Sequence, residues 1–309
     1  MKNIPENLSG VFAALPTPFG EDGDVLWDAL DAIVDFALAN GVEGLCLGGA
    51  TAEYAACSVE NRIEMFARVS QRAAGRAQLI CAVGAEHSGQ VHQLACAAEH
   101  ADAIALLFPP PVLLTYPQAD LVHFMAAVSA ELPLPVLLYN IPQCTRDLGI
   151  ANVLRLVEEV PNIIGLKDSS GHKPNMEAIR QAKARTPLIF LIGRDELFTE
   201  AVEHGAVGII TGIAGVCPEL VLPLDENLRA GKREEARVWQ DRVNEFISYF
   251  GDLQAPWVIK MGFQLRGLNV GTLAWPMRPE LERQARKFQD WFSTYLSASR
   301  APVLHPAGS

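Results

Sequence analysis

A lysine and a tyrosine stand near the ends of two consecutive apolar segments of the chain. Lys167 closes the apolar run that opens IIGLKDSS (163–170), and Tyr139 closes the one in LPVLLYNIP (134–142). Lysine is rarely buried, because its charge loses hydration in the interior. Burial in an apolar pocket favours the neutral amine, which can attack a ketone and form a Schiff base. A tyrosine within reach can move the proton that this chemistry requires.

Each feature also has a plainer interpretation. A lysine at the end of a strand can pair with a carboxylate or extend to water, and a lone tyrosine there can be a packing residue. The Gly-Gly turn of GGAT (48–51) lacks the GxxxxGK[ST] pattern of a phosphate loop. The seven histidines show no metal-ligand spacing, so we predict no metal.

The elements that must position these residues alternate regularly. Amphipathic segments of helical length separate the apolar runs, and Ser58 is a predicted N-cap of the helix over 58–74. Repeated strand–helix alternation predicts a parallel sheet, and eight units predict a closed (β/α)₈ TIM barrel of the α/β class. An open doubly wound sheet is the alternative, but its GxGxxG opening is missing. The eight runs cover 10–19, 41–51, 77–86, 101–110, 134–142, 162–170, 187–196 and 206–215.

The strand signal stops after residue 217. Helical stretches near 217–250, 254–268 and 279–297 follow, so we expect a barrel followed by a C-terminal helical segment. The predicted division is a barrel with the catalytic site over 1–225, a helical region over 226–297 and a flexible tail over 298–309.

The amino-acid composition limits the kinds of partner that we expect for the protein. The chain has 309 residues, half of them hydrophobic, and a formal net charge of −11, which disfavours nucleic acid as a partner. No stretch is apolar for long enough to span a bilayer, and MKNIPENLSG lacks the apolar core of a signal peptide. Six cysteines without CxxC spacing fit core packing. We therefore expect no membrane partner and a cytoplasmic location.

In such barrels the chemistry lies at the carboxyl ends of the strands. Because Tyr139 and Lys167 end consecutive strands, they are expected to be neighbours. If both point inward, a phenol faces an amine across space that Gly165 leaves open.

Five segments of the chain resemble the dihydrodipicolinate synthase/N-acetylneuraminate lyase family of pyruvate-dependent class I lyases. The resemblance runs in order over roughly residues 8–225. Its segments are LPTPF (15–19), GGATAEY (48–54), YNIP (139–142), IIGLKDSSG (163–171) and GIITG (208–212).

The resemblance implies roles for single residues. Lys167 falls on the Schiff-base lysine, Tyr139 on the proton-relaying tyrosine, and Thr51 on the hydroxyl that binds the pyruvate-derived carboxylate beside backbone N–H groups. Ile210 falls where a backbone carbonyl lines the pocket. Gly49, Ala50 and Ser169 complete the implied binding residues. The resemblance also implies a homo-oligomer, most often a tetramer, and no cofactor besides the covalent lysine–substrate bond.

Several positions depart from the family pattern. Ala50 removes a hydroxyl from the proton relay, and Ala52 replaces the glycine of a tight turn. Pro111 and Cys144 stand where dihydrodipicolinate synthases carry a tyrosine and an arginine, and a thiol cannot replace a bidentate guanidinium. Arg146, two positions after Cys144, is a candidate for partial compensation. These departures count against aspartate semialdehyde as the second substrate.

GRDELF (193–198) resembles the GYDE segment of the sialic acid lyases, whose acidic pair binds sugar hydroxyls. Asp195 and Glu196 are therefore candidate acceptors for a polyhydroxylated substrate, or else simply cap the following helix.

These observations favour a lyase that cleaves or forms a 2-keto acid with pyruvate and an aldehyde as partners, most simply a 2-keto-3-deoxy sugar acid aldolase. Alternatives within the class are a dihydrodipicolinate synthase, an N-acetylneuraminate lyase and a keto-deoxy acid dehydratase. A non-catalytic keto-acid-binding relative is the alternative from another class, and the presence of both Lys167 and Tyr139 counts against it.

Overall fold

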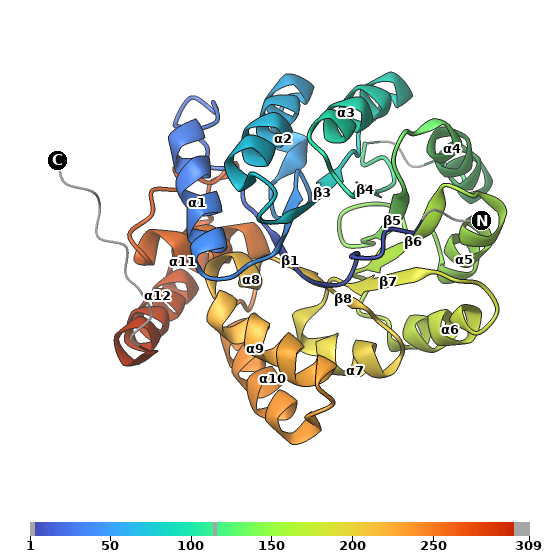
Figure 1. Cartoon of the computed structure of the whole chain (residues 1–309). Coiled ribbons are helices and arrows are strands. Elements are labelled where there is room, and N and C mark those ends of the chain that lie inside the picture. Colours follow the sequence, from blue (N-terminus) through green and yellow to red (C-terminus); the bar gives the residue numbers. More distant parts are fainter. Residues whose placement is uncertain (1–3, 114–115, 300–309) are drawn as a thin grey trace.

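Eight parallel strands close into a barrel in the order of the sequence (Figure 1). The computed structural model describes residues 4–113 and 116–299. β1 pairs with β8 as well as with β2, which closes the ring and confirms the predicted TIM barrel. Each strand lies within one of the eight predicted runs. The strands are β1 (Gly10–Ala14), β2 (Gly44–Leu47), β3 (Gln78–Ala82), β4 (Ala105–Phe108), β5 (Val136–Asn140), β6 (Ile163–Asp168), β7 (Ile189–Ile192) and β8 (Gly208–Thr211).

Helices connect the strands and surround them (Figure 1). Helical crossovers are what parallel neighbours require. The crossover helices are α1 (Trp27–Ala39), α2 (Val59–Ala73), α3 (Ser88–His100), α4 (Gln118–Glu131), α5 (Ile150–Glu159), α6 (Lys173–Lys183) and α7 (Phe198–Glu203), and the short α8 (Ile213–Val216) follows β8. Two single 3₁₀ turns, η1 (Tyr54–Ala56) and η2 (Asp195–Leu197), lie after β2 and β7.

Two hydrophobic clusters hold the barrel together. One fills its interior and includes Phe12, Leu107 and Leu191, while the other lies between the strands and the helices. Burial on both faces explains why the strands are almost continuously apolar.

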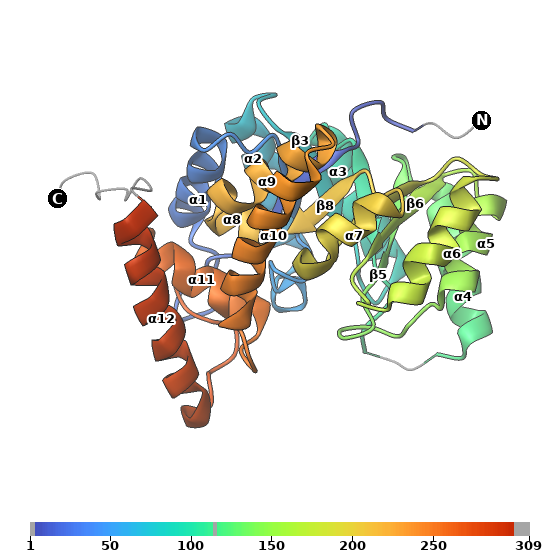
Figure 2. The ribbon, with the colours of Figure 1, turned by 90° about the horizontal axis from the view of Figure 1, so that it is seen from below.

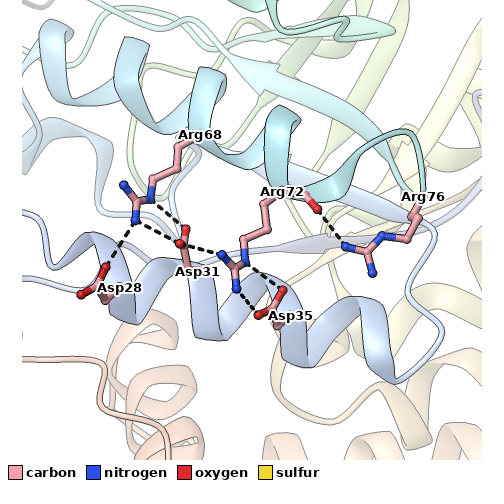
Figure 3. A network of polar contacts seen from close by, with 6 residues as sticks. All are labelled: Asp28, Asp31, Asp35, Arg68, Arg72 and Arg76. Atoms are coloured by element: carbon pink, nitrogen blue, oxygen red, sulfur yellow. Dashed lines mark hydrogen bonds and ion pairs between the residues drawn. The ribbon is translucent and has the colours of Figure 1, made fainter.

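The first two helices carry a matched set of charges. Ser58 accepts a hydrogen bond from the backbone N–H of Asn61 at 3.0 Å, which confirms the predicted cap of α2. On the outer surface, aspartates of α1 face arginines of α2 (Figure 3). Asp31 accepts from Arg68 at 2.8 Å and from Arg72 at 2.9 Å. Single exposed ion pairs contribute little, but a shared carboxylate fixes how the two helices lie against each other.

Four helices follow α8. They are α9 (Pro218–Arg229), α10 (Arg233–Ser248), α11 (Ala255–Leu265) and α12 (Pro279–Ser299). The predicted stretch over 217–250 is therefore two helices, because Gly231 takes a φ of +69° after α9 and turns the chain. Both ribbon views place α12 on the opposite side of the barrel from α4, α5 and α6 (Figures 1 and 2).

The predicted division at residue 225 falls inside α9 and stays a prediction. The predicted tail over 298–309 lies outside the described residues from position 300 onward. Among the helices described, none has the length and apolarity needed to cross a membrane.

Candidate active site

Lys167 and Tyr139 meet inside the barrel at the carboxyl ends of β6 and β5. They are direct partners in the strand register. Lys167 Nζ donates a hydrogen bond to Tyr139 Oη at 3.1 Å and lies 4.2 Å from the centre of the tyrosine ring. Both residues are buried, with 6% and 3% of their surface exposed. No ion pair joins Lys167 to a carboxylate in the part of the chain that the structure describes. The phenol is thus its close polar partner.

A β-bulge turns Lys167 inward. The register between β5 and β6 pairs Val136 with Ile163 but Leu137 with Gly165, so Ile164 is the extra residue. Ile164 packs in the barrel interior and Leu166 packs outside it, which leaves Lys167 on the inner face. Without the extra residue, the inward and outward directions of the following side chains in β6 would be exchanged, and Lys167 would point out of the barrel.

The space around Lys167 comes from Gly193 rather than from Gly165. A Cβ on Gly165 would lie 2.0 Å from the backbone oxygen of Ile189, so this glycine lets β6 and β7 approach closely. A Cβ on Gly193 would lie 2.5 Å from Lys167 Cε and 2.0 Å from Ser169 Oγ. The expectation for Gly165 was therefore wrong, because its missing side chain admits a neighbouring backbone.

The residues after Tyr139 and Lys167 tie the two strand ends together. Asn140 Nδ2 donates to Asp168 Oδ1 at 2.9 Å, and Asp168 also accepts from the backbone N–H of Ser170 at 3.1 Å. Ser169 N donates to the carbonyl of Asn140 at 2.8 Å. These bonds fix the ends of β5 and β6, and so the positions of the amine and the phenol.

A cavity of about 570 Å³ opens over Lys167. Its volume lies in the range of small-molecule sites and leaves room beyond a ligand as small as pyruvate. The predicted site residues in its wall are Ala50, Thr51, Tyr139, Lys167, Ser169, Asp195 and Ile210. Gly49 and Glu196 are not among its lining residues, so their binding roles stay predictions.

Asp195 and Glu196 have separate surroundings. The hydroxyl of Thr211 donates to Asp195 Oδ1, and Gln240 of α10 donates to the backbone oxygen of Asp195 at 2.9 Å. Burial raises the pKa of Asp195 to about 6, although the Thr211 hydrogen bond opposes the shift. Glu196 accepts from Arg194 Nε at 2.8 Å. The N-cap position of the following helix, α7, is Leu197, so neither carboxylate occupies it.

The loop after β2 turns without a glycine at position 52. Ala52 N donates to the carbonyl of Gly49 at 3.1 Å, and Thr17 Oγ1 donates to the carbonyl of Ala52 at 2.7 Å. The left-handed conformation falls instead on Gly48 and Glu53, with φ of +65° and +52°. Ala52 is therefore compatible with the turn, and Thr51 reaches the cavity.

The substituted positions differ in their relation to the cavity. Cys144 lies in its wall, whereas Pro111 is buried outside the lining. Arg146 is not among the lining residues either.

The C-terminal region supplies wall residues that the sequence analysis missed. They are Gln254, Ala255, Pro256, Trp257, Trp275 and Pro276. Strand-end position, the signal that located Lys167, does not apply to helices after the barrel. The neighbouring Trp and Pro residues near the start of α11 and before α12 are the signal that was available.

A second cavity lies away from Lys167. A cavity of about 450 Å³ lies at the amino end of the strands, where Arg229 pairs with Asp225 at 2.7 Å. Over residues 4–113 and 116–299, no group of three or more His, Cys, Asp or Glu side chains is placed to hold a metal ion.

Comparison with known proteins places the chain in a family. The model of the dihydrodipicolinate synthetase family matches residues 7–294. This chain belongs to that family. It is therefore an enzyme of the class I pyruvate-dependent lyases and synthases, as the resemblance predicted.

Individual relatives differ in their named activities. The chain is 28% identical over 279 residues to a 4-hydroxy-tetrahydrodipicolinate synthase of Bacillus subtilis, covering 89% of this chain and 95% of the relative. It is 31% identical over 283 residues to an N-acetylneuraminate lyase of Mediterraneibacter gnavus, covering 90% and 89%. The solved structure of a Ruminococcus gnavus sialic acid aldolase catalytic lysine mutant superimposes with a TM-score of 0.85 at 27% identity, covering 96% and 99%. Relatives with two different named activities thus have similar sequence identity to this chain.

Proposed function

We propose that this chain is a Schiff-base aldolase that cleaves or forms a 2-keto acid, with pyruvate as product or donor. The observation that supports this most strongly is the 3.1 Å hydrogen bond between Lys167 Nζ and Tyr139 Oη, in the wall of a cavity. A buried amine beside a proton-carrying phenol is what a carbonyl-attacking site requires.

The proposed reaction starts with attack of the neutral Lys167 amine on C2 of the keto acid. Tyr139 gives its proton to the C2 hydroxyl, which leaves as water, and the positively charged iminium withdraws electrons from C3. The Tyr139 phenolate then takes the proton of the C4 hydroxyl, the C3–C4 bond breaks, and its electron pair passes to C3 as an enamine while the aldehyde departs. Tyr139 returns this proton to C3, and water hydrolyses the iminium, which releases pyruvate, the free Lys167 amine and a proton that the Tyr139 phenolate takes up. No cofactor enters this scheme, and Thr51 is the proposed ligand of the C1 carboxylate.

The proposed substrate is a 2-keto-3-deoxy sugar acid. Asp195 supports it, because a carboxylate in the cavity wall accepts hydrogen bonds from hydroxyl groups. Cys144 in the wall counts against aspartate semialdehyde, whose charged groups need a partner such as a guanidinium. The pairing of Glu196 with Arg194 leaves Asp195 as the better placed of the two acidic residues. The predicted homo-oligomer and cytoplasmic location stay predictions.

Reduction with borohydride in the presence of pyruvate tests the Schiff base. We expect an irreversible adduct on Lys167, located by peptide mass spectrometry, and none in a Lys167→Arg variant. No adduct under conditions that trap a known class I aldolase, or an adduct on another lysine, would contradict the assignment.

A panel of keto-deoxy sugar acids, N-acetylneuraminate and aspartate semialdehyde tests the substrate class. We expect pyruvate release from at least one sugar acid and a loss of that activity in Asp195→Ala. Efficient use of aspartate semialdehyde alone would refute the sugar acid assignment. A fully active Asp195→Ala variant would remove Asp195 from substrate binding.

A further inference from the structure

Two tryptophans stand in the wall of the cavity that contains Lys167. Trp257 lies in the first turn of α11, and Trp275 lies in the segment between α11 and α12. Trp257 is half-buried, whereas 73% of the surface of Trp275 is exposed. Pro256 and Pro276 adjoin them in the same wall.

Hydrogen bonds and an ion pair hold the segments that carry these rings. Lys260, one turn after Trp257, lies 2.5 Å from Glu53 and donates to the backbone oxygen of Thr272 at 3.0 Å. Thr272 N donates to the carbonyl of Phe19 at 2.7 Å, and Ala274 N donates to Glu53 Oε2 at 3.3 Å. Trp275 therefore follows a residue that is bonded to the loop bearing Thr51. Because the backbone that carries the two rings is fixed in this way, less freedom is lost when a ligand binds against them.

One polar side chain in this part of the cavity is already engaged, because Gln143 Nε2 donates to the carbonyl of Ser169 at 2.7 Å. Ile141, Cys144 and Ala255 add further apolar surface. An exposed aromatic face inside a reaction cavity gains most from a flat apolar surface laid against it.

We propose that Trp257 and Trp275 form an aromatic subsite that selects aldehydes with a flat apolar face. This inference rests on the proposed aldolase function and specifies the half of the substrate that is not pyruvate. An aryl ring and the C–H face of an extended sugar chain offer the same chemistry, and the experiment separates them.

The test compares three 4-hydroxy-2-keto acids whose C4 substituent is methyl, phenyl or a polyhydroxylated chain. Trp257→Ala and Trp275→Ala should each lower kcat/KM for the phenyl or the polyhydroxylated compound, relative to the methyl compound, by roughly 3- to 10-fold. A fall in kcat/KM for the phenyl compound relative to the methyl compound indicates an aryl ligand. A fall in kcat/KM for the polyhydroxylated compound relative to the methyl compound indicates a sugar chain. Phe replacements should retain part of the selectivity.

Trp239→Phe is the matched control, because Trp239 lies on α10 outside the cavity wall and contacts Arg242. It should leave all ratios unchanged. A second measurement needs no turnover: 2-oxo-4-phenylbutanoate, which cannot be cleaved, should compete with pyruvate for borohydride trapping better than 2-oxopentanoate does. Both alanine variants should reduce that advantage.

Unchanged ratios in both alanine variants, with pyruvate still trapped on Lys167, would overturn the aromatic subsite alone. A shift in oligomeric mass in Trp275→Ala with unchanged ratios would overturn it too, because the ring would then serve contact between copies. An absent adduct in the wild-type protein would refute the proposed aldolase function itself, and the subsite with it.

Discussion

The hydroxyl and the ring of Tyr139 have separable roles. The ring packs in the barrel interior and lies 4.2 Å from Lys167 Nζ, whereas the hydroxyl makes the 3.1 Å hydrogen bond. Tyr139→Phe should therefore keep the fold and lower kcat by roughly 10²- to 10⁴-fold, the usual contribution of a positioned proton carrier. Steady-state kinetics on the cleaved keto acid and a thermal melt measure the two effects. Near-normal turnover would remove Tyr139 from the mechanism.

The carboxylate of Asp195 links stability to pH. Its pKa rises from 3.8 to about 6 in the folded protein, mainly through burial, with Thr211, Glu196 and Lys167 as the interacting groups. Between these values the folded protein holds a proton that the unfolded chain has released, so stability falls as pH rises through this window and stays lower above it. Asp195→Asn should therefore gain more stability over wild type at about pH 7.5 than at about pH 4. Urea unfolding at both values measures this, and equal differences would contradict it.

At the level of single residues, the sequence predicted the site residues that lie at the ends of strands. Lys167 and Tyr139 are adjacent because consecutive parallel strands are neighbours, a relation that strand order alone implies. Trp257 and Gln240 reach the site from helices after the barrel, and only the tertiary packing of those helices brings them there. The ion pair that engages Glu196 depends on side-chain geometry, which no motif specifies.

At the scale of elements, β6 combines a bulge with a close approach to β7. Its apolar run predicted the strand, but the extra residue at Ile164 and the reason for Gly165 depend on the register with both neighbours. The break between α9 and α10 was missed because amphipathic patterning continues on both sides of Gly231.

Gly165→Ala tests the close approach. The new Cβ would meet the backbone of Ile189 at 2.0 Å, so one strand must shift, at a cost of about 1–3 kcal/mol as for other overpacked cores. The shift would also move Lys167, two residues further along β6. Gly215→Ala in α8 is the matched control, because its nearest neighbour would lie at 3.6 Å. Chemical denaturation should show a loss for Gly165→Ala alone, and equal losses would contradict this account.

At the scale of the whole molecule, the barrel and the C-terminal helices share one cavity. The barrel contributes Lys167 and Thr51, the first turn of α11 contributes Trp257, and the segment between α11 and α12 contributes Trp275. The sequence predicted two regions and their order, but a region without strands gives no sign that it completes a site at the barrel mouth. The Glu53–Lys260 ion pair links the two regions directly, beside the hydrogen bond from Thr272 N to the carbonyl of Phe19.

The ion pair between Glu53 and Lys260 should contribute to the stability of the whole chain. Lys260 is 1% exposed, and burial lowers its pKa despite the nearby Glu53 carboxylate. Glu53→Gln would leave the ammonium buried without its counter-charge, which should cost about 3–5 kcal/mol of unfolding free energy. Glu53→Gln combined with Lys260→Met should recover most of that loss, because both charges are then gone.

Urea unfolding of the two variants measures this pair, with Lys173→Met as a control that removes a lysine from an exposed ion pair and should change stability little. Because Glu53 also holds Ala274, beside Trp275, the single variant should loosen the cavity wall and raise KM for the keto acid. A double variant less stable than Glu53→Gln would show that the Lys260 stem and its bond to Thr272, rather than the charge pair, hold the two regions together.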